Sequence, residues 1–209
     1  MKQPLTTGNV EDAHALLEKI AARTDAGDNA VIALYLLARI EQDHVTPARL
    51  TEARTHYRAV IDGHPEHALA GQAAVQLALL DAWGDPEKDI NVAVAEVEAL
   101  LAGTRRPEAQ RELHFILARL QFEGRHDMAA AITHLEAGRA LNYQKPFRNA
   151  EVDLMIADMA RQSGKPELAL SHYQAFLLAN ARDSRASTVR GYVKELQGRT
   201  DATAVAVKP

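Results

Sequence analysis

Histidine is the residue type of this sequence with the most chemistry to offer, because an imidazole can bind a metal ion or transfer a proton near neutral pH. There are nine histidines and no cysteine. Three of them, His56, His134 and His172, occupy equivalent places in similar but separate segments, whereas metal ligands must converge to about 2.0–2.2 Å from one centre. His64 and His67 form the tightest pair, but a proline separates them and no third ligand is near. The sequence therefore predicts no metal site.

Motifs for catalysis are also missing from the sequence. It has no Gly-x-Ser-x-Gly segment, no glycine-rich phosphate loop and no His-Glu-x-x-His segment, which are the patterns that position a nucleophile, a phosphate or a zinc ion. Acidic pairs such as Glu11 and Asp12, or Glu96 and Glu98, are expected on solvated helix faces. We therefore expect a protein that is not an enzyme and that needs no cofactor. A catalytic site built from residues far apart in the sequence is the alternative.

A short motif recurs along the chain at a nearly constant spacing. The segment Leu37-Ala38-Arg39-Ile40 returns at 77–80, 117–120 and 156–159, with steps of 40, 40 and 39 residues. A second series of alanines lies between these segments, at Ala13, Ala53, Ala93, Ala131 and Ala169. Two interleaved series indicate two helices in each repeat, and such units bury their apolar faces only against their neighbours. We predict that each alanine lies at a helix crossing, where a methyl group lets two helices pack closely.

The repeats, over roughly residues 11–198, resemble a known family. Ala53, Tyr57, Val60 and Pro65 have the spacing of the second helix of a tetratricopeptide repeat, and Gly164-Lys-Pro-Glu-Leu-Ala169 is similar to the glycine turn that precedes that helix. The period is nearer 39 residues than the usual ~34, and the longer turns resemble those of Sel1-like relatives. The resemblance implies an all-α fold, a right-handed α-α superhelix of antiparallel helix pairs with about five repeats of 38–40 residues.

The helix boundaries follow from prolines near helix starts and glycines at helix ends. We predict a repeat domain over residues 11–198, an N-terminal tail over 1–10 and a flexible C-terminal tail over 199–209. The predicted helices span 11–24, 28–43, 47–63, 67–83, 87–103, 107–123, 126–142, 147–163, 166–180 and 184–197.

Composition narrows the classes of partner. The chain is 47% hydrophobic and 25% charged, with a net charge of −4, and its basic residues are interspersed with acids, so we expect no nucleic-acid binding. The longest apolar stretch, Ala30–Ala38, is shorter than the ~20 residues that cross a bilayer, so we expect no direct membrane insertion. The compartment is undecided between cytoplasm and periplasm. The first helix resembles a second-type helix without its partner, which suggests a fragment lacking its native N-terminus.

The resemblance also indicates where a partner would bind, because the first helices of tetratricopeptide-like stacks line the concave side. Aromatic residues and arginines gather there, as is typical of binding hot spots. The expected groove residues are Tyr35, Arg39, Gln42, Trp83, Phe115, Arg119, Phe122, Asp158 and Arg161. For Phe115 and Phe122 the alternative is burial between repeats.

These residues lead to one functional hypothesis and two alternatives. We expect a non-catalytic protein–protein interaction scaffold that binds a peptide or protein segment in its concave groove, with Arg39, Arg119 and Arg161 meeting acidic groups of that segment. The first alternative is a structural or assembly subunit of a bacterial envelope, secretion or polysaccharide-export complex, in which self-association is possible. The second is the docking region of a larger enzyme.

Overall fold

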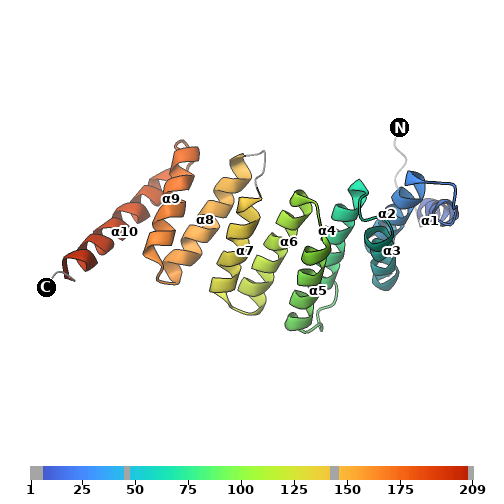
Figure 1. Cartoon of the computed structure of the whole chain (residues 1–209), viewed down its shortest axis with the longest axis horizontal. Helices are drawn as coiled ribbons and strands as arrows, with labels where there is room; N and C mark the ends of the chain where they lie inside the picture. The colour runs from blue at the N-terminus through green and yellow to red at the C-terminus, as the bar shows by residue number, and fades with distance from the viewer. Residues whose placement is uncertain (1–6, 45–47, 142–145, 207–209) are drawn as a thin grey trace. The chain divides into compact units, whose positions relative to one another are not determined.

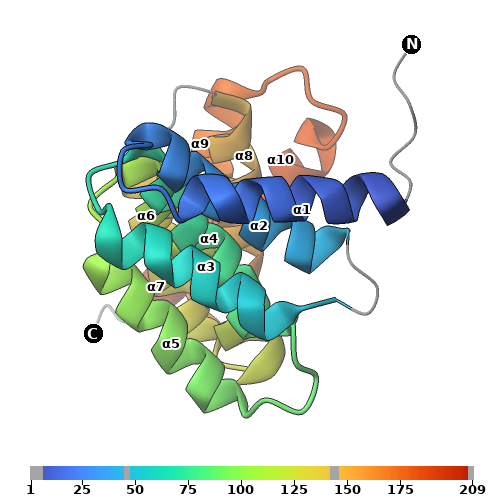
Figure 2. The same cartoon turned by 90° about the vertical axis from the view of Figure 1, so that its right-hand side faces the viewer.

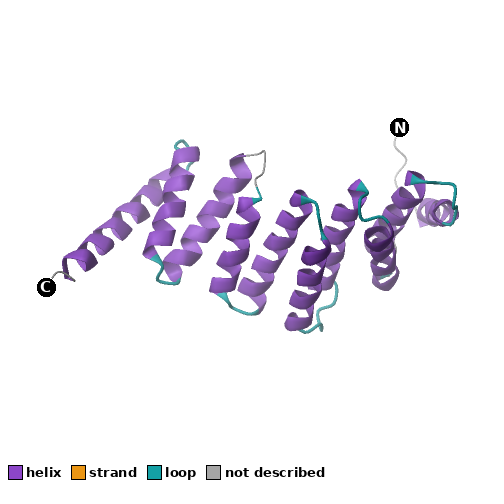
Figure 3. Ribbon diagram, viewed as in Figure 1, coloured by secondary structure: helices purple, strands orange, loops and turns teal. Residues whose placement is uncertain are grey.

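The computed structural model describes residues 7–44, 48–141 and 146–206, and these residues form helices joined by loops, with no strand among them (Figures 1 and 3). The predicted all-α fold class is therefore confirmed. None of the helices in these ranges is long and apolar enough to span a membrane.

Ten α-helices and one π-helical turn make up the described chain. They are α1 (Thr7–Ala21), α2 (Asp28–Asp43), α3 (Leu50–Gly63), α4 (Ala68–Trp83), α5 (Ile90–Gly103), α6 (Pro107–Arg119), η1 (Leu120–Gly124), α7 (Met128–Ala140), α8 (Pro146–Gln162), α9 (Pro166–Ala179) and α10 (Ala186–Ala206).

The helices belong to two compact units, residues 1–116 and 117–209. In the first unit each helix from α1 to α4 packs against the next, α4 packs against α5, and α2 also contacts α4. Figure 2 shows α1 lying against α2. In the second unit η1 packs against α7, and α7, α8, α9 and α10 follow one another in contact. Packing between neighbours in the sequence is what a chain of helical repeats requires.

The alanines of the two recurring series are buried, with one exception. In the first series every alanine is at most 3% exposed: Ala38, Ala78, Ala118 and Ala157. In the second series Ala53, Ala93, Ala131 and Ala169 are at most 2% exposed, while Ala13 on α1 is partly buried. The residue before each first-series alanine is also buried: Leu37, Leu77, Leu117 and Ile156. The two alanine series therefore lie on the buried faces of their helices, as the crossing prediction requires.

The three largest differences from the predicted helix boundaries are at α1, α6 and α10. Helix α1 begins at Thr7, inside the expected N-terminal tail, and residues 1–6 lie outside the described ranges. Helix α10 continues to Ala206 through a segment rich in alanine, a strong helix former. The helix expected over 107–123 changes at Leu120 to a π-helical turn, in which the Arg125 amide donates to the Leu120 carbonyl at 3.2 Å.

Candidate binding groove

The first helix of each repeat has one face whose residue types recur from repeat to repeat and one face whose residue types differ. The buried face repeats, because the same alanine and leucine positions return every 40 residues. The outer face does not: α2 presents Ile32 and Leu36 where α4, forty residues later, presents Gln72 and Gln76. Packing explains why the inner face is uniform. The outer face, whose residues differ between repeats, is therefore the candidate binding surface.

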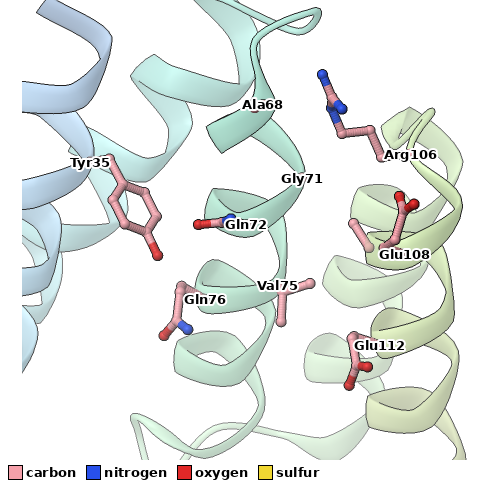
Figure 4. Close-up of a pocket in the computed structure, with 10 residues that line it drawn as sticks. Tyr35, Ala68, Gly71, Gln72, Val75, Gln76, Arg106, Glu108 and Glu112 are labelled. Carbon is pink, nitrogen blue, oxygen red and sulfur yellow. The ribbon is translucent and has the colours of Figure 1, made fainter. Parts of the chain in front are cut away.

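A groove of about 470 Å³ lies on this outer face in the first unit (Figure 4). This size is within the range of small-molecule and peptide side-chain pockets, roughly 300–1,000 Å³. Helices α2, α4 and α6 and the residue before α6 contribute to it. The lining residues are Tyr35, Ala68, Gly71, Gln72, Val75, Gln76, Arg106, Glu108, Ala109 and Glu112.

The floor of the groove depends on a close approach between α4 and α6. A Cβ atom added to Gly71 would lie 3.0 Å from the Cβ atom of Ala109 and 3.2 Å from Cδ of Arg106. The absence of a side chain at Gly71 therefore lets α4 and α6 come together beneath the groove. Val75, one turn further along α4, adds an apolar side chain to the same floor (Figure 4).

The walls of the groove are polar. Gln72 and Gln76 project from α4 towards the side of Tyr35, and Glu108 and Glu112 project from α6 on the opposite side (Figure 4). A carboxamide both donates and accepts hydrogen bonds, whereas an ionised carboxylate only accepts them. Arg106 is the cation among the lining residues, and its Nη2 atom donates to the Glu66 carbonyl at 2.9 Å.

Tyr35 connects this groove to the residues predicted on α2. Its ring packs edge-on against Tyr57, with ring centroids 5.9 Å apart. The Tyr57 hydroxyl donates to Oε1 of Gln42 at 2.8 Å, and burial raises the pKa of Tyr57 above its ordinary value of 10, so this hydroxyl keeps its proton. Arg39 forms an ion pair with Asp43 one turn away, at 2.5 Å. Of these predicted residues, Tyr35 lines the groove, while Arg39 and Gln42 are held by partners within the protein.

The other predicted residues of the first unit lie elsewhere on its surface. Trp83, at the end of α4, is 39% exposed, and Phe115 is half-buried with the Arg111 guanidinium 5.1 Å from its ring centroid. Neither residue lines the groove.

In the second unit, the predicted residues of α8 meet at one tyrosine. The Tyr173 hydroxyl donates to Asp158 at 2.5 Å and accepts from Nε of Arg161 at 3.2 Å. The Arg161 guanidinium also stacks on Tyr192, 4.5 Å from its centroid. Burial and the bond to Asp158 raise the pKa of Tyr173 above 10. Asp158 and Arg161 thus bind side chains of α9 and α10.

Arg119 and Phe122 belong to the end of α6 and to the π-helical turn. Nε of Arg119 donates to Glu123, one turn away, at 2.8 Å. Phe122 is 39% exposed, so the alternative of burial between repeats is wrong for this residue. The π-helical turn changes which face of the chain each side chain occupies, and a continuous 3.6-residue period could not predict that change.

A set of buried acids, which no sequence motif predicted, holds the helices together. Glu41 on α2 is 1% exposed, and its two oxygens lie 3.0 Å from Nε2 of His14 on α1 and 2.7 Å from Nδ1 of His56 on α3. Asp81 on α4 is 2% exposed and accepts from Nε of Arg54 on α3 at 2.9 Å. A buried charge is tolerated where such partners compensate for lost water.

The second unit has an equivalent tie on α8. Asp153 is 3% exposed and lies 2.7 Å from Nδ1 of His172 on α9 and 2.6 Å from Nε of Arg139 on α7. One signal of these ties is present in the sequence, because Glu41 and Asp81 each follow a recurrent alanine by three residues. His56 and His172 pair with these acids, and no group of three metal-ligating side chains converges among the residues that the structure describes.

Comparison with protein-family models and with curated proteins finds no match to this chain.

Proposed function

We propose that this protein is a non-catalytic, tetratricopeptide-like interaction module that binds an extended segment of another protein in the groove of α2, α4 and α6. The observation that carries the proposal is the groove itself, with its apolar floor and polar walls on the one face of the first helices whose side chains do not repeat.

The two glutamines of α4 suit the backbone of an extended peptide. Gln72 and Gln76 are four residues apart, so they are separated by about 6 Å along the helix axis. An extended chain repeats its outward-facing backbone groups every two residues, or about 6.6 Å. Two carboxamides at this spacing can each bind one peptide unit of the same segment, because each offers both a donor and an acceptor.

The apolar surfaces supply the rest of the expected contact. Val75 lies between the two walls, and the half-buried Tyr35 ring closes one side (Figure 4). Ala109 adds a methyl group to the lining. A tyrosine at such a place combines apolar area with a hydroxyl, which is why tyrosine is common at binding hot spots. Side chains of a bound segment would alternate between this floor and solvent.

A display library of random twelve-residue peptides, selected on the whole chain, tests the proposal. Binding of the selected peptides is then measured by fluorescence anisotropy for the wild type and for the double variant Gln72→Ala, Gln76→Ala. We expect the double variant to weaken binding at least tenfold while its circular dichroism and melting temperature stay unchanged. The matched control is Gln162→Ala, an exposed glutamine of α8, which should bind normally. Selected peptides that bind both variants equally would refute the groove as the binding site.

A further inference from the structure

We infer that the segment bound in this groove carries a lysine or arginine side chain, which is held by Glu108 and Glu112 of α6. This inference rests on the proposed function, and it names the chemistry of the ligand that the groove selects.

The α6 wall gives the groove a negative character. Glu108 and Glu112 are four residues apart on one helix face, and both side chains lie on the groove side of α6 (Figure 4). The Glu108 side chain is exposed, so its carboxylate is open to a ligand that enters the groove. Arg106, the cation of the lining, lies at the end of the groove and donates to the Glu66 carbonyl. A cation that enters the groove would therefore meet two carboxylates on one wall.

The shape of the groove suits a long cationic side chain. The methylene groups of a lysine or arginine can lie on the apolar floor formed by Val75 and Ala109 while the charged group reaches the carboxylates. An acidic side chain at the same place would meet like charges.

This chemistry is the opposite of the sequence-based hypothesis, in which arginines meet an acidic segment. Arg39 forms an ion pair with Asp43 on its own helix and does not line the groove. Gln72 and Gln76 occupy the α4 wall and carry no charge. The charge that the groove presents to a ligand therefore comes mainly from α6.

The test compares the peptides selected from the random library before and after the two carboxylates are neutralised. For the wild type we expect selected peptides to be enriched in lysine or arginine at one position. The double variant Glu108→Gln, Glu112→Gln should bind them about tenfold more weakly, since a charged hydrogen bond contributes at least that factor, and replacing the basic residue by norleucine should cause a similar loss. The control Glu87→Gln, Glu98→Gln removes the same charge from exposed positions near and on α5 and should leave binding unchanged.

Two other outcomes would overturn the inference and can be told apart. Peptides that require Gln72 and Gln76 but show no basic residue, or that bind the Glu108→Gln, Glu112→Gln variant normally, would refute the inference and leave the proposed function standing. A library that gives no peptide dependent on Gln72 and Gln76 would refute both. Salt provides a second readout, because binding through these charges should weaken as ionic strength rises.

Discussion

Nδ1 of His56 lies 2.7 Å from Oε2 of Glu41, and this contact ties α3 to a carboxylate that is almost completely buried in α2. His172 and Asp153 repeat the relationship between α9 and α8 at the same distance. Both histidines follow a recurrent alanine by three residues, yet the acids differ in place, since Glu41 lies three residues after Ala38 and Asp153 four residues before Ala157. The two units thus reach the same kind of helix tie from different acids.

Glu41→Gln should destabilise the first unit by about 1–3 kcal/mol, because a neutral carboxamide replaces a buried carboxylate whose two oxygens each lie within hydrogen-bond distance of a histidine nitrogen. Urea unfolding followed by the fluorescence of Trp83, the single tryptophan, measures this change. Glu52→Gln, an exposed glutamate of α3, should change stability by less than about 0.5 kcal/mol. Equal unfolding midpoints for the two variants would contradict a stabilising role for the Glu41 tie.

Gly84→Ala should lower the stability of the first unit by about 1–3 kcal/mol through steric overlap. A Cβ atom there would lie 2.5 Å from the Leu80 carbonyl oxygen, which accepts hydrogen bonds from the Gly84 amide and from Arg54. Gly63→Ala is the matched comparison, because its Cβ atom would meet nothing within 4 Å, and it should stabilise by about 0.4–1 kcal/mol through the unfolded chain. Thermal melts of the two variants should therefore shift in opposite directions, and a shared direction would refute this argument.

Gly164→Ala should destabilise the second unit by about 1–2 kcal/mol, because Gly164 has a φ of +69° and an alanine is strained there even though the space around it is open. His126 occupies the corresponding place before α7, also with positive φ, at 55°. We expect His126→Gly to relieve strain and to raise the unfolding midpoint measured by circular dichroism. Gly191→Ala, in the interior of α10 and also in open space, should be stabilising, and a loss of stability there would show that added bulk, not backbone conformation, causes the effect at Gly164.

Arg185 should give the second unit a stability that depends on pH. Its hydrogen bonds lower the pKa of Asp183 from 3.8 to about 2 and lower the pKa of Glu151 below 4.5. Groups with a lowered pKa in the folded state stabilise it above their ordinary pKa, and this contribution disappears as pH falls through the folded value. The urea midpoints of wild type and Arg185→Gln should therefore differ most above pH 4.5 and converge towards pH 2.

Arg182→Gln is the control for this pH effect, since Arg182 is an exposed arginine three residues earlier. Its midpoint should stay parallel to that of the wild type across the same pH range. A difference between Arg185→Gln and wild type that is constant from pH 5 to 2 would mean that the two carboxylates do not cause the stabilisation.

The sequence by itself determined the helices and their buried faces. Periodic alanines such as Ala38 and Ala78 report which residues must meet a neighbouring helix, because a close crossing excludes larger side chains. These alanine positions depend only on nearby residues and recur at a fixed interval, so their spacing alone identifies the buried faces. It also placed Tyr35 on the face that lines the groove.

Only the tertiary structure decided which side chains of the outer face lie together in a groove. The groove exists because Gly71 and Ala109, which are 38 residues apart, approach closely enough to bring the glutamines of α4 opposite the glutamates of α6. The partner of Arg161 was decided in the same way, because its hydrogen bond is to Tyr173 of the neighbouring helix α9. The physical reason is that burial follows a local period, whereas the pairing of polar groups depends on distances between helices, which no single period encodes.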